Sequence, residues 1–430
     1  MTGILCSIVG IGGAVSTNGC WLAHLHGGTD LANKIAISSI GNIYICGYSN
    51  AAAVNDIQVF KYSPEGSLVW QKRLAYASST NDIGTGIVLD SSENIYISGY
   101  TNASATNDAV LVKLDSSGTI LWQRKYGGTA NEVGNGVTLD GSGNVYLVGH
   151  TSTGGTQDVS VVKYNSSGTI QWQRRVTGGS GLPSLATSVV ADSLGATYAV
   201  GYSAPASGTF AGVIIKHTSA GSLSTRNTLS TTGTTTIFND IAQDTNGNMY
   251  AVGYSTYSGS INSIILAKYN SSGTIQWQRI LSGNSSIGYG VAVGSLNEIY
   301  IVGLSSPGTQ ACQIAKYNSS GTLQWQRVLR TNVTVFGRSI EADSQYIYLT
   351  GHITSNDIIS AKLKADGSLT GTYSVGGYNF TYEASSLTAG TSTLSSNSAP
   401  TMTSATPTLT DTTSSFSSSN SGLTSSVTLI

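Results

Sequence analysis

Hydrophobic and polar residues alternate along most of the chain in short runs, and clusters of Gly, Ser, Asn and Asp separate one run from the next. Alternation with a period of two predicts strands with one buried face, and these clusters predict tight turns. In the stretch that follows residue 85, the pattern predicts strands at 86–90, 94–101, 108–115 and 119–126. No helical pattern lies between these runs, so the chain is expected to be all-β.

The same group of four predicted strands recurs along the sequence, marked by a Tyr-x-x-Gly signature. Successive glycines of the signature are 48 to 52 residues apart. The seven copies are Tyr44 and Gly47, Tyr96 and Gly99, Tyr146 and Gly149, Tyr198 and Gly201, Tyr250 and Gly253, Tyr300 and Gly303, and Tyr348 and Gly351. We expect each glycine to let adjacent sheets or a central channel approach closely, because it has no side chain.

A tryptophan in the last strand of the unit is the second marker of the repeat, and we expect it to cover the outer interface between units. It is present in five copies, at Trp70, Trp122, Trp172, Trp277 and Trp325. Thr225 and Gly371 occupy this position in the fourth and seventh copies. These two copies are therefore degenerate at this point.

Four antiparallel strands in about 50 residues is the sequence pattern of a propeller blade, and a lone blade cannot bury both of its faces. Seven copies therefore predict a seven-bladed β-propeller with four antiparallel strands per blade. We divide the chain into an apolar N-terminal segment (1–20), the propeller (21–376) and a Ser/Thr-rich C-terminal extension (377–430).

The N-terminal part of the propeller predicts how the ring closes. The sequence that begins at Trp21 resembles the last strand of a blade, for example the one that contains Trp122, but it comes before the first copy. We expect this strand to join the last blade and to displace or flank the degenerate strand at 369–375.

The stretches Gly-Asn-x-Tyr-x-x-Gly and Ser-Ser-Gly-Thr-Ile-x-Trp-Gln-Arg resemble those of the seven-bladed β-propeller repeat family called SBBP. The resemblance covers roughly residues 21–376. It implies the propeller fold, and membership of a group found in bacterial secreted and surface proteins and in bacteriophage tail or other virion proteins. No catalytic residue comes with it.

The C-terminal extension differs sharply in composition from the propeller. Of the 47 residues from Ala384 to Ile430, 27 are Ser or Thr, and Asp411 carries the single charge. Such a segment needs β-pairing along a sheet edge or packing in an assembly to become ordered. Its apolar residues, mostly about seven apart, indicate a repeated unit. We favour docking onto partner subunits, and leave open that the tail lies on its own propeller.

Charge and cysteine content exclude several classes of function. The net charge is −1 and no run of Lys or Arg occurs, so a nucleic-acid ligand is not expected. The four cysteines are scattered and are expected to be free thiols without a zinc site. The apolar stretch near the N-terminus is short and no basic residue precedes Lys34, so we expect neither a cleaved export signal nor a membrane span.

Residues that could support catalysis or metal binding are few. His24 and His26 share a strand face but have no third ligand nearby, and His150 and His352 replace tyrosines of other blades. Turn aspartates are too sparse for a calcium loop. The acids at Asp56, Asp108, Asp158 and Asp357 recur with the repeat, so they should spread around the ring. No catalytic, cofactor-binding or metal-binding residue is predicted.

The sequence therefore predicts a non-enzymatic structural or interaction protein without a cofactor. The most favoured role is a bacteriophage virion component, a tail or fibre part that presents the propeller for contact with the host surface or with other subunits. Its expected partners are other virion subunits or copies of itself through the C-terminal tail, and a host-surface glycan on the loops of one rim, such as 49–56 and 101–108. The alternative is a secreted or surface-anchored bacterial propeller that acts as a carbohydrate-binding or adhesion module.

Overall fold

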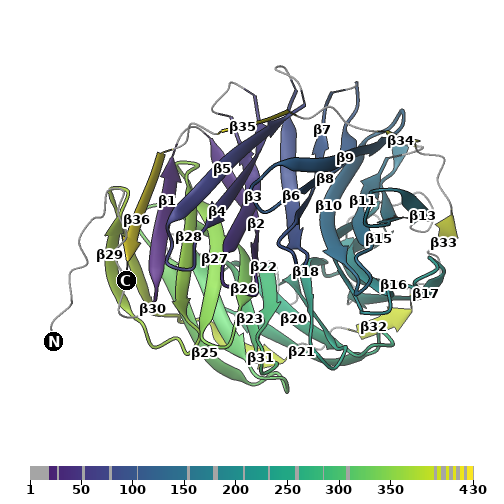
Figure 1. Ribbon diagram of the computed structural model, residues 1–430. Helices are drawn as coiled ribbons and strands as arrows, with labels where there is room; N and C mark the ends of the chain where they lie inside the picture. The colour runs from purple at the N-terminus through teal and green to yellow at the C-terminus, as the bar shows by residue number, and fades with distance from the viewer. Residues whose placement is uncertain are drawn as a thin grey trace.

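The computed structural model describes residues 19–429 except for 27–28, 51–53, 77–79, 104, 153–154, 178–182, 207–208, 231–232, 257–260, 284, 307–309, 392–394, 399–402, 406–409, 413–416 and 421–423. The elements of this part are β-strands, and they form seven sheets in a ring (Figure 1). The predicted seven-bladed β-propeller, with four antiparallel strands per blade, is confirmed. The predicted N-terminal segment 1–20 lies outside the described residues as far as residue 18.

Six of the blades are each built from four consecutive strands, of which the first lies nearest the ring axis. Blades 1 to 3 contain β2 (Asp30–Ile37), β3 (Ile43–Ser49), β4 (Asp56–Tyr62) and β5 (Leu68–Ala75); β6 (Asp82–Leu89), β7 (Ile95–Thr101), β8 (Asp108–Leu114) and β9 (Ile120–Gly127); and β10 (Glu132–Leu139), β11 (Val145–Thr151), β12 (Asp158–Tyr164) and β13 (Ile170–Thr177). Blades 4 to 6 contain β14 (Ser184–Ala191), β15 (Thr197–Ala206), β16 (Thr209–His217) and β17 (Leu223–Ser230); β18 (Thr236–Gln243), β19 (Met249–Ser255), β20 (Ser263–Tyr269) and β21 (Ile275–Ser282); and β22 (Ser286–Val293), β23 (Ile299–Ser305), β24 (Ala311–Tyr317) and β25 (Leu323–Arg330).

Blade 7 combines the two ends of the propeller. Its first three strands are β26 (Val335–Ala342), β27 (Tyr346–Ile353) and β28 (Ile358–Lys364), and its fourth strand is β1 (Trp21–His26), antiparallel to β28. The degenerate strand β29 (Gly371–Val375) lies in the sheet of blade 6 instead. The N-terminal strand thus has the predicted place, and it displaces the strand that the seventh copy would have supplied.

The C-terminal extension adds one more strand to every blade, and we call strands β30 to β36 the outer belt (residues 378–429). Each pairs antiparallel with the outermost strand of a blade, in the order of blades 6, 5, 4, 3, 2, 1 and 7: β30 (Tyr378–Ala384), β31 (Thr388–Thr391), β32 (Ser395–Ser398), β33 (Thr403–Ala405), β34 (Thr410–Thr412), β35 (Ser417–Asn420) and β36 (Thr424–Leu429). Figure 1 shows these strands, from yellow-green to yellow, at the rim. The belt lies on its own propeller, the arrangement that the sequence left open, and docking onto partner subunits stays a prediction.

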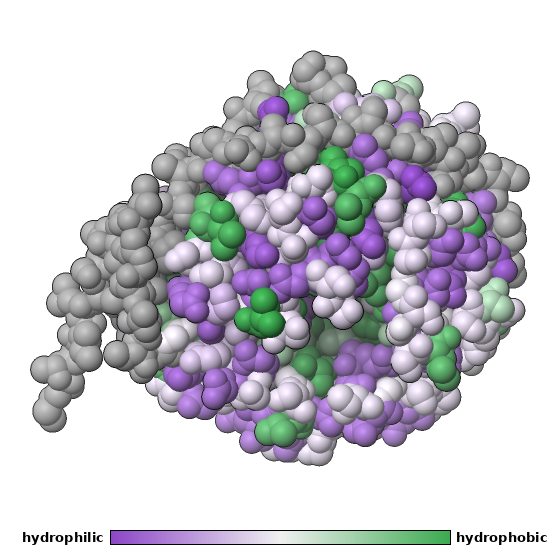
Figure 2. All heavy atoms as spheres, viewed as in Figure 1, coloured by the Kyte–Doolittle hydropathy of each residue, from purple (hydrophilic) through white to green (hydrophobic). Residues whose placement is uncertain are grey.

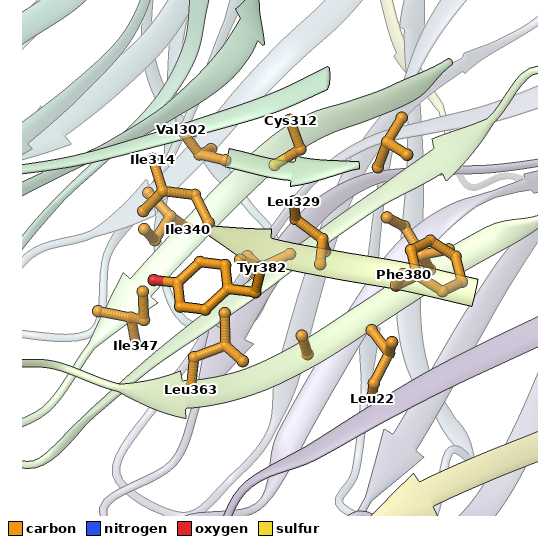
Figure 3. Packing of buried hydrophobic residues seen from close by; sticks show 14 of the residues in the cluster. Leu22, Val302, Cys312, Ile314, Leu329, Ile340, Ile347, Leu363, Phe380 and Tyr382 are labelled. Atoms are coloured by element: carbon orange, nitrogen blue, oxygen red, sulfur yellow. The ribbon is translucent and has the colours of Figure 1, made fainter. Parts of the chain in front are cut away.

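The hydrophobic core is divided into seven clusters, one at each interface between neighbouring blades. Figure 3 shows the cluster between blades 6 and 7, where Phe380 and Tyr382 of the belt pack with Leu329 and with Leu22 of β1. Phe380 is fully buried, and burial of a side chain of this size contributes about 2–3 kcal/mol. The first belt strand is therefore part of the core, not only an edge strand.

The first strand of blade 2 is longer than its alternation predicts. In blade 2 the prediction began at residue 86, whereas β6 begins at Asp82. The reason is a β-bulge, because the register with β7 shifts between Gly84 and Gly86 and breaks the period of two. A Cβ atom on Gly99 of the Tyr-x-x-Gly signature would lie 2.1 Å from the carbonyl oxygen of Ile83. The close approach at this glycine is therefore within its own blade, beside the bulge, and not to an adjacent sheet.

Candidate functional site

The tryptophans of the repeat fasten each blade to the next. The indole Nε1 of each donates to a carbonyl in the hairpin turn between the third and fourth positions of the following blade, at 3.0–3.3 Å: Trp70 to Ser116, Trp122 to Ser166, Trp172 to Ser219, Trp277 to Ser319, Trp325 to Ala365 and Trp21 to Pro64. Trp21 of β1 makes the same contact from blade 7 to blade 1. The N-terminal strand therefore closes the ring in the same geometry as every internal interface that has a tryptophan.

The tyrosines of the repeat are buried between blades, where they stabilise turns. Tyr146 donates to Asp140 at 2.9 Å, and Tyr96, Tyr250 and Tyr348 donate to the corresponding turn aspartates. A lysine of the third strand lies over each ring, with Lys113 Nζ 4.7 Å from the centre of Tyr96. These contacts hold the hairpins in place. The tyrosine side chains of the signature are therefore engaged in packing between blades and are not free for a ligand.

The recurrent acids lie at the starts of the third strands, where three of them form ion pairs inside their own blades. Asp56 pairs with Arg73 at 3.2 Å, Asp108 with Lys125 at 2.8 Å and Asp158 with Arg175 at 3.6 Å. Asp357, the fourth, lies 3.1 Å from Nε2 of His24.

Within the described residues no group of three metal-ligating side chains occurs, and no helix is long and apolar enough to cross a membrane. Cys20, Cys46 and Cys312 are buried free thiols, and Cys6 lies outside the described part.

A central cavity of about 380 Å³ lies on the ring axis and is lined by the first strands of the blades. In Figure 2 the surface is hollowed where these strands converge in Figure 1. A volume of this size suits a small molecule. The cavity is the candidate functional site, because it gathers side chains that depart from the repeat.

The bulge residue of each first strand faces this cavity. In blades 1 to 5 it is a short polar residue that donates to a backbone carbonyl of the next blade at 2.7–2.9 Å: Asn33 to Gly84, Thr85 to Gly134, Asn135 to Ala186, Thr187 to Phe238 and Asn239 to Gly288. In blades 6 and 7 the bulge residues are Tyr289 and Arg338. Among the described residues, these two make no hydrogen bond of this kind.

The residue after the bulge is Gly or Ser in five blades but charged in two. Lys34 of blade 1 reaches Asp240 of blade 5, with Nζ 2.6 Å from both carboxylate oxygens. Asp240 also accepts hydrogen bonds from the Ser188 hydroxyl at 2.7 Å and from the Val291 amide at 3.1 Å. Because Asp240 is buried and fully hydrogen-bonded, the pair is neutralised within the protein and joins blades that are not neighbours in the ring.

Glu341 is the fourth charged residue of the cavity that departs from the repeat, since other blades have residues such as Ala36 or Val88 at this position. The pKa of Glu341 is raised to about 7, mainly by burial, while the charge of Lys34 lowers it and the carboxylate of Asp240 raises it. A carboxyl group with this pKa changes charge near neutral pH. The cavity therefore contains one fixed ion pair, one titrating acid and one guanidinium.

These residues were not predicted from the sequence, because the acids considered there recur with the repeat and were expected to spread around the ring. The signal that could have found them is departure from the repeat at otherwise equivalent positions. Aligning the seven first strands shows Lys34, Asp240, Tyr289, Arg338 and Glu341 as departures from small or short polar residues. The rim loops expected to bind sugar lie partly outside the described residues, and that expectation stays a prediction.

Comparison with known proteins supports the repeat. Residues 69–104 match the family model described as SBBP, beta-propeller repeat, which spans the end of blade 1 and the start of blade 2. No curated protein matches the chain. The chain is thus a seven-bladed β-propeller protein. It carries the SBBP repeat, as the sequence resemblance predicted.

Solved structures with similar arrangement have very low sequence identity. They include a protein of unknown function from Dyadobacter fermentans (9% identity, covering 80% of this chain and 99% of that one, TM-score 0.46) and the Cps50 (Swd1) β-propeller domain of Myceliophthora thermophila (8%, 79% and 98%, 0.47). A gluconolactonase from Xanthomonas campestris is also similar (11%, 79% and 88%, 0.38). At these identities and TM-scores the likenesses carry no information about activity.

Proposed function

We propose that this chain is a non-enzymatic structural and interaction protein, and that it serves as a bacteriophage virion component, in a tail or fibre, with its ring presented toward the host surface or toward other subunits. The outer belt is the observation that carries the proposal. Open edge strands pair with other chains, and the belt supplies a partner strand to the outer edge of each of the seven blades. The outermost strands are then the short belt strands and β29, three to six residues long, and short edge strands recruit other chains less readily than long ones.

Two further features support this role. The Tyr and Trp residues of the repeat, which could otherwise stack on a ligand, are engaged between blades. The family resemblance includes proteins of virions and of bacterial surfaces. The competing role, a secreted or surface-anchored carbohydrate-binding module, rests on the same resemblance and on the rim loops.

The two roles differ in where the protein is found. Density-purified phage particles from the source would be analysed by peptide mass spectrometry, and antibody against residues 21–376 would locate the protein by immunogold microscopy. The proposal expects peptides in the particle fraction and gold at one place on the particle. Peptides found only in the cell-surface or medium fraction would overturn it in favour of the bacterial adhesion module.

A further inference from the structure

Arg338 lines the central cavity without a hydrogen bond or an ion pair to any described residue. Its Nε atom is buried and has no hydrogen-bond partner. The bulge residues of blades 1 to 5 are short and bonded to the next blade, so a longer, charged side chain at this position contributes nothing to that fastening. A guanidinium with a buried, unbonded donor is costly unless something else accepts from it.

Aromatic rings hold the guanidinium of Arg338 in one place. Its centre lies 4.5 Å from the ring centre of Tyr289 and 5.4 Å from that of Phe336. Phe336 is stacked on His352, with ring centres 4.5 Å apart. Burial, with a smaller contribution from Arg338, lowers the pKa of His352 to about 3, so this ring is neutral at ordinary pH. Stacking uses the faces of a guanidinium and leaves its in-plane N–H groups to donate, which is how Arg recognises carboxylates.

Arg338 carries the one charge of the cavity lining that no other described group balances below about pH 7. Lys34 and Asp240 neutralise each other, and Glu341 is uncharged below about pH 7 because burial raises its pKa to about 7. The remaining polar lining, which includes Thr138, Ser188 and Gln243, consists of hydroxyl and amide groups. The cavity therefore offers one positive charge together with neutral hydrogen-bonding groups.

We propose that the central cavity binds a small, hydroxyl-bearing carboxylate of the size of a sugar acid, and that Arg338 holds its carboxylate. The volume of about 380 Å³ accommodates a molecule of monosaccharide size. The carboxylate accepts hydrogen bonds from the guanidinium of Arg338 on the side that lines the cavity, and the hydroxyl groups contact the polar lining. This site is independent of the proposed virion role, because it uses no residue of the belt or of the rim.

The test is isothermal titration calorimetry on the full chain at pH 6.0, with glucuronate as the probe. Glucose is the uncharged probe of the same size, and inorganic phosphate is an anion without a carboxylate. The proposal expects saturable binding of glucuronate at one site per chain, with at least tenfold weaker binding of glucose and phosphate. Equal binding of phosphate would overturn the carboxylate assignment, and absence of glucuronate binding would overturn the site.

Variants locate the binding on Arg338. Arg338→Gln is expected to weaken glucuronate binding at least tenfold, and Arg338→Met, which keeps the packing against Tyr289, is the second variant if the first does not fold. Arg330→Gln is the matched control, since Arg330 lies on the outer strand β25 and pairs with Glu383. Unchanged binding in a folded Arg338 variant would contradict the proposal.

The pH dependence gives an independent readout. Glu341 becomes anionic above about pH 7, where it opposes a bound carboxylate. If the anion binds only when Glu341 is protonated, affinity falls about tenfold between pH 6 and pH 8. Glu341→Gln is expected to bind equally at both values. A loss of affinity that persists in this variant would show that Glu341 does not control the site.

Discussion

The signature glycine of each blade allows the backbone of the second strand to pack closely against the bulge of the first strand. The glycine of the Tyr-x-x-Gly signature lies beside the bulge of its own blade, and the bulge in turn directs one side chain into the central cavity. At Gly149, a Cβ atom would lie 1.8 Å from the carbonyl oxygen of Val133. The bulge and the glycine are therefore one structural device, repeated in every blade.

This close approach predicts the effect of adding one methyl group. Gly149→Ala forces the two strands of blade 3 apart and is expected to lower the free energy of unfolding by about 3 kcal/mol or more. Gly390→Ala is the control, because the nearest atom to its Cβ would be 3.5 Å away, an ordinary contact. Urea denaturation of both variants checks this, and similar stability of the two would contradict the account of the signature.

His217 is a residue for which burial predicts a pH effect. It is fully buried beside Trp172, and burial, with a smaller contribution from Arg174, lowers its pKa to about 4. The unfolded chain binds a proton near pH 6.5 and the folded chain does not, so stability is lost as the pH falls from 6.5 toward 4. At pH 4.5 the loss from this residue is about 2–3 kcal/mol.

His217→Leu tests this effect, since Leu114 occupies the same position in blade 2. The difference in unfolding free energy between pH 7.5 and pH 4.5, measured in urea, is expected to be smaller in the variant by that amount. His352 also titrates below its usual range, so part of the pH dependence remains. An identical difference in both proteins would show that His217 is charged in the fold.

At the scale of elements, the two ends of the chain complete the sheets. The belt strands β31 to β36 begin at residues 388, 395, 403, 410, 417 and 424, so the chain advances by one blade in seven or eight residues. The apolar residues of the tail are also about seven residues apart, so their spacing matches the number of residues that the belt uses for each blade. Of these residues, Leu387 is buried against the core, and Leu394, Met402, Leu409, Phe416 and Leu423 lie outside the described part.

The belt predicts different effects for two truncations. Ending the chain after Thr391 removes β32 to β36 and exposes the outer edges of blades 1 to 4 and 7. We expect a small fall in thermal midpoint and a clear gain in self-association, because the eight-residue strands β5, β9, β13 and β17 replace short belt strands as the edges, and long unpaired edges recruit other chains. Ending it after Val375 also removes Phe380 and Tyr382 from the core, and each lost aromatic side chain costs about 3–5 kcal/mol.

Size-exclusion chromatography with light scattering, together with thermal unfolding, separates the two truncations. The shorter chain is expected to unfold at a much lower temperature than the one that ends at Thr391. Equal thermal midpoints would contradict the placement of β30 in the core. A chain ending at Thr391 that stays monomeric at high concentration would contradict the role of the belt in covering the longer edge strands.

For the whole molecule, recurrence along the sequence was enough to predict the ring. The spacing of Tyr44, Tyr96 and their equivalents gave the number of blades, and the similarity of Trp21 to Trp122 gave the closing strand. The path of the belt could not be predicted, because its pairing uses backbone groups that are the same in any Ser/Thr-rich sequence. The cavity was missed because its distinctive residues, such as Lys34 and Arg338, do not recur.

The central claim is that strand β1 closes the ring by completing blade 7. The most direct measurement is the thermal unfolding of a chain that lacks residues 1–28, alone and with a peptide of residues 19–28 added. Since Trp21, Leu22 and Leu25 are buried, we predict a fall in midpoint of about 10 °C or more, reversed by the peptide but not by one with Ser at positions 21 and 22. An unchanged midpoint in the shortened chain would show that the ring does not depend on β1.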